Sequence, residues 1–168
     1  MDPPVPALRD RADACAAVLG DADRVLVVAH IDADGLTSAA IATPALRRTG
    51  VPVETAFADQ LDAAVVSRVA ATEHDVVLFT DLGSGQLPAI NEHADRGAFT
   101  PVIADHHRPA DADTRYHLNP LLEGVDGASE LSGAGTVYVL ARALDDENVD
   151  LAALAVVGAV GAMQASGG

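Results

Sequence analysis

Three side chains with metal-binding chemistry follow an apolar run in the first quarter of the sequence. His30, Asp32 and Asp34 occupy every second position after the run 25–29. Side chains two residues apart in an extended backbone point the same way, so these three can converge on one spot. Carboxylates gathered at the end of a buried strand are costly unless a cation lies between them. The spacing therefore predicts a site for a divalent metal ion.

Two more apolar segments end in the same kinds of side chain. One is followed by Asp81, and the other by Asp105, His106 and His107. The carboxyl ends of parallel strands meet at one edge of a sheet, so three such strands would bring all these groups together. Imidazoles and carboxylates without a thiolate suit Mn²⁺ better than a structural zinc ion. Several carboxylates can also hold two ions about 4 Å apart, an arrangement that stabilises phosphoryl transfer and needs no side-chain nucleophile.

The elements that must position these groups alternate along the chain between strand-like and helix-like segments. Runs of Val, Ile, Phe and Thr predict strands at residues 24–29, 53–58, 76–80 and 100–104. Helices are expected at residues 7–19, 36–48, 61–72, 86–93, 133–144 and 151–163, and a long loop at 108–130. Nearly continuous apolar strands separated by helices predict an α/β fold with a mainly parallel β-sheet sandwiched by helices, a Rossmann-like arrangement.

The composition limits the location and the partners of the protein. Its 168 residues suit a single domain, and the single cysteine, Cys15, excludes an intrachain disulfide. No apolar run reaches the roughly 18 residues of a membrane span, so we expect a cytoplasmic protein with no membrane partner. The formal net charge is −15, from an excess of acidic residues over arginines with no lysine, which suggests a halophilic archaeal cytoplasm. An acidic surface of that origin does not exclude a polyanionic substrate.

The order and spacing of the candidate ligands resemble the first three motifs of the DHH phosphoesterase superfamily. Within it, the chain is most similar to RecJ-like nucleases, particularly archaeal ones, from about residue 25 onward. The residues that carry the resemblance are His30-x-Asp32-x-Asp34-Gly35, Asp81 and Asp105-His106-His107. The resemblance implies a metal-dependent phosphoesterase of the DHH fold.

The resemblance also implies two metal sites that share Asp81. His30 and Asp32 would complete the first site, and Asp34 and His106 would complete the second. The expected ion is Mn²⁺ at both sites, and Mg²⁺ would also suit these ligands.

Roles in substrate binding and catalysis follow from the same resemblance. His107 would contact the scissile phosphate, and Asp105 would orient the histidine pair as a hydrogen-bond acceptor. Arg108 would either bind a phosphate oxygen through two N–H groups or pair with a nearby aspartate. The small residues at the start of the helix at 133–144 would either face a phosphate with their N–H groups or form a plain helix cap. These residues are Ser132, Gly133 and Gly135.

The chain departs from the family pattern at two points. The fourth motif supplies an aspartate ligand, whereas this chain has Ala162 at that position, in the sequence Gly-Ala-Val-Gly-Ala at 158–162. We expect this change to weaken the second metal site and to reduce hydrolysis severely. The resemblance also implies a smaller C-terminal substrate-binding domain, and we expect this domain to be absent here. Residues 1–168 are therefore expected to form a single DHH catalytic domain.

The favoured function is Mn²⁺-dependent hydrolysis of phosphodiester bonds, as a RecJ-like exonuclease on single-stranded DNA or RNA ends. One alternative is hydrolysis of a small phosphate ester, such as a short oligonucleotide, a cyclic dinucleotide or pyrophosphate. Another is a catalytically weakened scaffold that binds replication or repair proteins, which Ala162 favours and the intact ligand residues oppose. His74 and His93 are expected at helix ends or on the surface, away from the site. His117 is expected nearer to it, and the sequence leaves open whether it contacts substrate.

Overall fold

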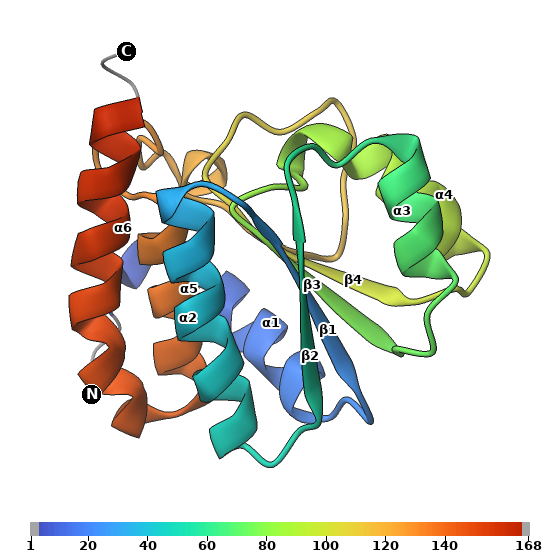
Figure 1. Cartoon of the computed structure of the whole chain (residues 1–168). Helices are drawn as coiled ribbons and strands as arrows, with labels where there is room; N and C mark the ends of the chain where they lie inside the picture. The colour runs from blue at the N-terminus through green and yellow to red at the C-terminus, as the bar shows by residue number, and fades with distance from the viewer. Residues whose placement is uncertain (1–3, 166–168) are drawn as a thin grey trace.

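A computed structural model, which describes residues 4–165, contains one parallel sheet with the strand order β2-β1-β3-β4-β5 (Figure 1). The strands are β1 (Val25–His30), β2 (Val53–Ala58), β3 (Val76–Thr80), β4 (Thr100–Ala104) and β5 (Tyr116–Leu118). The first four agree with the predicted strands to within about one residue. The strand β5 lies inside the segment expected to be a loop, and it is too short to show a periodic pattern.

Helices cover both faces of the sheet, which confirms the predicted α/β fold. In Figure 1, α1, α2, α5 and α6 lie on one side of the sheet, and α3 and α4 lie on the other. The α-helices are α1 (Arg9–Gly20), α2 (Ala33–Arg48), α3 (Ala63–Ala70), α4 (Leu87–Asp95), α5 (Gly133–Leu144) and α6 (Ala152–Ala165). Short 3₁₀ helices are η1 (Pro6–Leu8), η2 (Ser84–Gln86), η3 (Pro120–Glu123) and η4 (Asp146–Leu151). Within the described residues, no helix has the length and apolar content needed to cross a bilayer.

Side chains of β1, which lies between β2 and β3, point alternately into two apolar clusters. Val25 and Val27 lie in the cluster beneath α1, α2 and α5, whereas Leu26 and Val28 lie in the cluster beneath α3 and α4. All four are buried. Both faces of the strand are covered, which explains why its sequence lacks the polar alternation of a half-exposed strand.

The register of the sheet brings the ends of three strands to the same level. Ala29 of β1 pairs with Thr80 of β3, and Thr80 pairs with Ala104 of β4. The residues that follow these three are therefore neighbours at the carboxyl edge of the sheet. This common edge was predicted from the parallel arrangement, and the pairing confirms it.

The turn from β1 into α2 differs from the extended backbone that the sequence pattern predicts. The helix begins at Ala33 rather than at residue 36, because the Asp32 side chain caps it by accepting the Gly35 N–H at 2.8 Å. A Cβ atom at Gly35 would lie 2.2 Å from the carbonyl oxygen of His30, so only glycine permits this close turn. Asp32 and Asp34 thus reach the strand end from a helix cap and a first helical turn.

Candidate metal centre

Asp81 lies at the centre of the site, directly after β3. Its φ of +57° is in the left-handed region, which is uncommon for residues other than glycine. The side chain is 1% exposed, and neither of its carboxylate oxygens has a hydrogen-bond partner among the described residues. Burial and the nearby carboxylates raise the pKa of Asp81, although the His106 ring opposes this shift. Backbone strain and a buried carboxylate without a hydrogen bond both cost free energy, and they occur together where a functional group is held ready.

The His30 ring is oriented by a backbone carbonyl outside the site. Its Nε2 lies 3.1 Å from the carbonyl oxygen of Asp59 and is placed to donate to it. The Nδ1 atom then faces inward, 3.0 Å from Asp32 Oδ2 and 3.8 Å from Asp81 Oδ2. This Nδ1 is buried and has no hydrogen-bond partner in the described part of the chain. A lone pair aimed between two carboxylates is the arrangement expected of a metal ligand.

The His106 ring is held in the same way from the opposite side. Its Nδ1 lies 2.6 Å from the carbonyl oxygen of Gly127, and its Nε2 lies 3.2 Å from Asp81 Oδ1 and 3.6 Å from Asp34 Oδ2. Burial disfavours charge on the ring, but the Asp81 carboxylate and the Gly127 carbonyl outweigh it and raise the pKa of His106 to about 9. A Cβ atom at Gly127 would lie 2.3 Å from the His106 carbonyl oxygen, so glycine is required for this approach.

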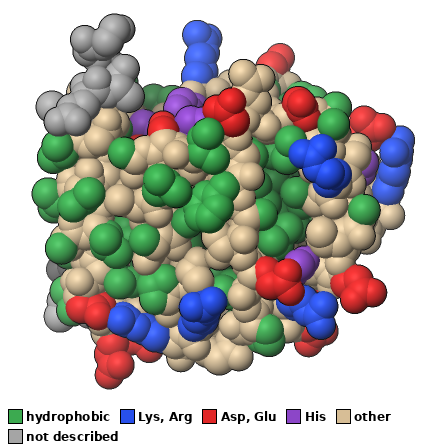
Figure 2. All heavy atoms as spheres, viewed as in Figure 1, with side chains coloured by type: hydrophobic (Ala, Val, Ile, Leu, Met, Phe, Trp, Pro, Cys, Tyr) green, Lys and Arg blue, Asp and Glu red, His purple; other side chains and the backbone are tan. Residues whose placement is uncertain are grey.

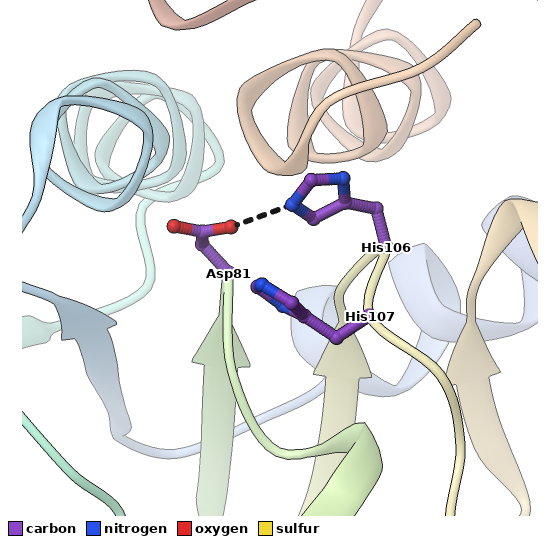
Figure 3. A group of neighbouring side chains, drawn as sticks. All are labelled: Asp81, His106 and His107. Carbon is purple, nitrogen blue, oxygen red and sulfur yellow. Dashed lines mark ion pairs between the residues drawn. The ribbon is translucent and has the colours of Figure 1, made fainter. Parts of the chain in front are cut away.

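Two sets of potential ligands meet at Asp81. In one set, ligand atoms of His30, Asp32 and Asp81 all lie within 4.8 Å of one another. In the other, the same holds for Asp81, His106 and His107. Figure 3 shows the second set, with both imidazoles coming from the segment after β4 toward the Asp81 carboxylate. The donors are nitrogen and oxygen atoms only, a combination that suits Mn²⁺ and related borderline ions.

The Asp34 carboxylate already accepts hydrogen bonds within the protein, unlike that of a metal ligand with two free oxygens. It accepts the N–H groups of Gly133 and Ala134, both at 2.8 Å, at the N-terminus of α5. The Gly135 N–H donates to Ser132 Oγ at 3.1 Å, as in an ordinary helix cap. The amides considered for phosphate binding are therefore engaged within the protein. A phosphate contact remains a prediction for Ser132, which lines the cavity described below.

Asp105 is fully buried and fixes the direction of His107. Asp105 Oδ1 lies 2.7 Å from His107 Nδ1 and accepts the His106 N–H at 2.8 Å, while Oδ2 accepts the Ser84 N–H at 3.0 Å. Burial opposes its ionisation, but the His107 ring and the backbone N–H groups prevail and lower the pKa of Asp105 to about 2. The same contact raises the pKa of His107, whose side chain is 57% exposed. Asp105 thus holds an exposed histidine ring at the rim of the site.

The ligand groups open into two adjoining cavities that share Asp81 and His107. The larger, of about 490 Å³, is bounded by the loop at 126–132, by Arg108 and by Ala159 and Ala162 of α6. The smaller, of about 410 Å³, lies beside His30. Histidine and acidic side chains gather at the upper edge of the surface in Figure 2, where the strands end in Figure 1.

The other histidines lie outside this cluster. His93 is in the last turn of α4. His74 precedes β3 at the opposite edge of the sheet, and it is 6% exposed rather than on the surface, with Nδ1 3.0 Å from Thr72 Oγ1. His117 lies in β5, buried and 2.9 Å from Ser84 Oγ, and it lines neither of the two cavities.

Several contributors to the site were not predicted from the sequence. They are the carbonyl groups of Asp59 and Gly127 and the side chains of Ser84 and Asn119. Each acts on a residue at least 12 positions away along the chain, so no local spacing identifies it.

Comparison with known sequences identifies the family to which the chain belongs. The sequence model of the DHH family, N-terminal domain, matches residues 24–159. The chain belongs to the DHH family. An uncharacterized protein of Methanocaldococcus jannaschii is 35% identical to this DHH domain over 149 residues, which cover 83% of this chain and 33% of that protein. The single-stranded-DNA-specific exonuclease RecJ of Dickeya dadantii is 30% identical over 136 residues, covering 75% of this chain and 23% of the relative.

Solved structures give the same result for the fold. RecJ of Thermus thermophilus in complex with Mn²⁺ is similar to this DHH domain with a TM-score of 0.74 and 26% identity, over 94% of this chain and 24% of that chain. The chain therefore spans about a third or less of the length of each of these relatives.

Gly133→Ala is expected to weaken Mn²⁺ binding at least about tenfold, the range typical of changes beside a metal ligand. The added Cβ atom would lie 2.3 Å from Asp81 Oδ1 and would displace that carboxylate. Gly135→Ala is the matched control, because its Cβ atom would approach the flexible end of Leu131 at 2.7 Å and Ser132 Oγ at an ordinary 3.5 Å, and no metal ligand is among these neighbours. Calorimetric titration with Mn²⁺ in molar KCl measures both, and equal affinities for the two variants would contradict this account of Asp81.

Proposed function

We propose that this DHH domain hydrolyses phosphodiester bonds with Mn²⁺ as cofactor, and that its substrate is the end of a single-stranded nucleic acid. One observation carries the proposal: the buried carboxylate of Asp81 has no hydrogen-bond partner among the described residues and lies between two sets of nitrogen and oxygen donors. The similarity to RecJ proteins, one described with bound Mn²⁺ and one as a single-stranded-DNA-specific exonuclease, supports the choice of ion and substrate.

The residues present fit a pair of divalent ions. His30, Asp32 and Asp81 would hold one ion, and Asp81 and His106, with Asp34 beside them, would hold the other. The inward nitrogens of both histidines are set by carbonyl acceptors on their outer nitrogens, so each ring faces the site without rotating. The raised pKa of His106 means that its Nε2 would release a proton when an ion binds. When bound, such a pair of ions orients the phosphate, polarises it and activates a water molecule near neutral pH.

The side chains at the rim would act on the substrate directly. With its Nδ1–H donated to Asp105, His107 has Nε2 left for a phosphate oxygen or for the leaving oxygen. Its raised pKa favours the protonated ring, which can donate that hydrogen bond. Arg108 lines the larger cavity and would bind a second phosphate oxygen. The catalytic roles of His107 and Asp105 are thus proposed as phosphate contact and orienting acceptor.

A second candidate is hydrolysis of a short oligonucleotide or another small phosphate ester. The charges on the wall of the larger cavity favour this candidate. Among the described residues that line the cavity, Arg108 is the one arginine, and the loop at 126–132 contributes Asp126 and Glu130. A long polyanion would meet repulsion along that loop, whereas a dinucleotide would not extend past it. A scaffold that binds replication or repair proteins is the third outcome to be distinguished.

The decisive experiment compares substrates of graded length. The metal-stripped protein in molar KCl is incubated with single-stranded DNA, RNA and duplex DNA, and with dinucleotides, each with Mn²⁺, Mg²⁺ or chelator. Release of mononucleotides from single strands with Mn²⁺ is the expected result. Activity confined to dinucleotides would favour the small-ester candidate. Stoichiometric Mn²⁺ binding without any hydrolysis would favour the scaffold and overturn the proposal.

A further inference from the structure

A buried polar network lies behind His107, and one of its members, Asp105, also lines the smaller cavity. It consists of Ser84 in η2, Asp105 after β4, His117 in β5 and Asn119 before η3. Ser84, Asp105 and Asn119 are 0% exposed and His117 is 4% exposed. Polar groups this deeply buried are costly unless each finds a partner, so the direction of their hydrogen bonds can be followed.

The first arm of the network holds the backbone of His107. Asn119 Nδ2 donates to the His107 carbonyl oxygen and to Ser84 Oγ, both at 2.9 Å. Because Ser84 Oγ accepts from Asn119, its own O–H is free to donate to His117 Nε2, 2.9 Å away. That direction requires a neutral His117 imidazole with an unprotonated Nε2. Burial lowers the pKa of His117 to about 4, which agrees with the neutral form.

The second arm holds the His107 ring. The Ser84 N–H donates to Asp105 Oδ2 at 3.0 Å, and Asp105 Oδ1 lies 2.7 Å from His107 Nδ1. Ser84 therefore supports His107 twice, through Asn119 at the carbonyl and through Asp105 at the ring. The other contact of this ring is edge-to-face with the His106 ring, at 4.5 Å between centroids, and the side chain is otherwise 57% exposed.

We propose that His117 and Ser84 are positioning residues for His107. His117 Nε2 accepts a hydrogen bond from the Ser84 hydroxyl and thereby fixes the Ser84–Asn119 and Ser84–Asp105 contacts that aim the His107 ring at the cavities. The inference rests on the proposed function, in which His107 contacts the scissile phosphate. His117 itself does not contact substrate.

The position of His117 in the sheet argues against a purely structural role. It pairs with Ile103 of β4, and the next residue, Leu118, is completely buried in the core. An apolar side chain would occupy this position without the desolvation cost of an imidazole. Of the charged groups near it, Arg11 donates to the His117 backbone carbonyl at 3.3 Å and pairs with Glu123, so that contact does not depend on the ring.

The test measures the order of the His107 ring and the kinetics of hydrolysis in the whole chain. His117→Phe keeps a planar ring, slightly larger than imidazole, and removes the acceptor, and His117→Gln restores an acceptor oxygen near the position of Nε2. His74→Phe is the matched control, a buried histidine at the opposite edge of the sheet. Ring order is measured by ¹³C relaxation of histidine Cε1 in metal-free protein, with His106, held by Gly127, as the internal reference.

With His117→Phe, the order parameter of the His107 ring is expected to fall from a rigid value of about 0.85 to below about 0.6, while His106 is unchanged. The kcat is expected to fall about tenfold with KM and Mn²⁺ affinity within about twofold, and His117→Gln is expected to recover most of the loss. Unchanged His107 order in His117→Phe would overturn the inference, as would an equal loss of kcat in His74→Phe. If the wild type lacks hydrolase activity, the proposed function fails and the ring-order measurement still decides whether His117 positions His107.

Discussion

Asp81→Asn is expected to abolish hydrolysis and, in the same protein, to raise the melting temperature of the metal-free form. Activity is lost because both proposed metal sites share this carboxylate. The metal-free fold becomes more stable because a buried carboxylate with a raised pKa is destabilising at any pH where it is ionised. The unfolded carboxyl ionises near its ordinary pKa of 3.8, so stability falls as the pH rises above that value. Asparagine removes this cost and tolerates the positive φ well.

The expected gain in chelator at pH 8 is about 1 to 2 kcal/mol, or roughly 3 to 6 °C in Tm for a domain of this size. The stabilisation that Mn²⁺ gives to the wild type should be absent from the Asp81→Asn variant. Asp126→Asn is the matched control, because it removes one exposed carboxylate from the wall of the same cavity. Thermal melts of the three proteins with chelator and with Mn²⁺ measure both effects. A variant that melts lower in chelator and still responds to Mn²⁺ would contradict this role of Asp81.

Ala162→Asp is expected to raise the Mn²⁺ stoichiometry toward two ions per chain and to increase hydrolysis at least about tenfold. Ala162 lines the larger cavity together with Asp32, Asp34 and Asp81, so a carboxylate there would add negative charge beside the proposed second ion. The family resemblance implies an aspartate at this position, which is why a gain rather than a loss is expected.

Ala159→Asp is the control for this gain, since Ala159 lines the same cavity one helical turn earlier in α6. It adds the same charge to the cavity without restoring the family pattern. Metal analysis after gel filtration and nuclease assays in molar KCl measure both variants. No change in stoichiometry or rate with Ala162→Asp would favour the scaffold, and an equal gain with Ala159→Asp would show that position 162 has no special part.

The sheet and the meeting of the three motifs could be predicted because both follow from local patterns. The continuous apolar run 25–29 requires covering on both faces, and parallel pairing then places His30 level with Asp81 and Asp105. The strand β5 could not be predicted, because a three-residue strand beside β4 depends on its partner rather than on its own sequence.

The fine structure of the site could not be predicted for a similar reason. The acceptors that orient His30 and His106 are backbone carbonyls, and every residue type has one. Asp34 was expected to face a metal ion, and its contacts with the N-terminus of α5 join residues about a hundred positions apart. The strained backbone of Asp81 likewise has no signature in its residue type.

Anomalous diffraction from crystals grown with Mn²⁺ tests the central claim most directly, because it locates the ion independently of any activity. A strong peak is expected within bonding distance, about 2.0 to 2.3 Å, of Asp81, His30 Nδ1 and Asp32, and a weaker second peak is expected between Asp81 and His106 Nε2. The absence of any peak at Asp81 from crystals with saturating Mn²⁺ would contradict the central claim.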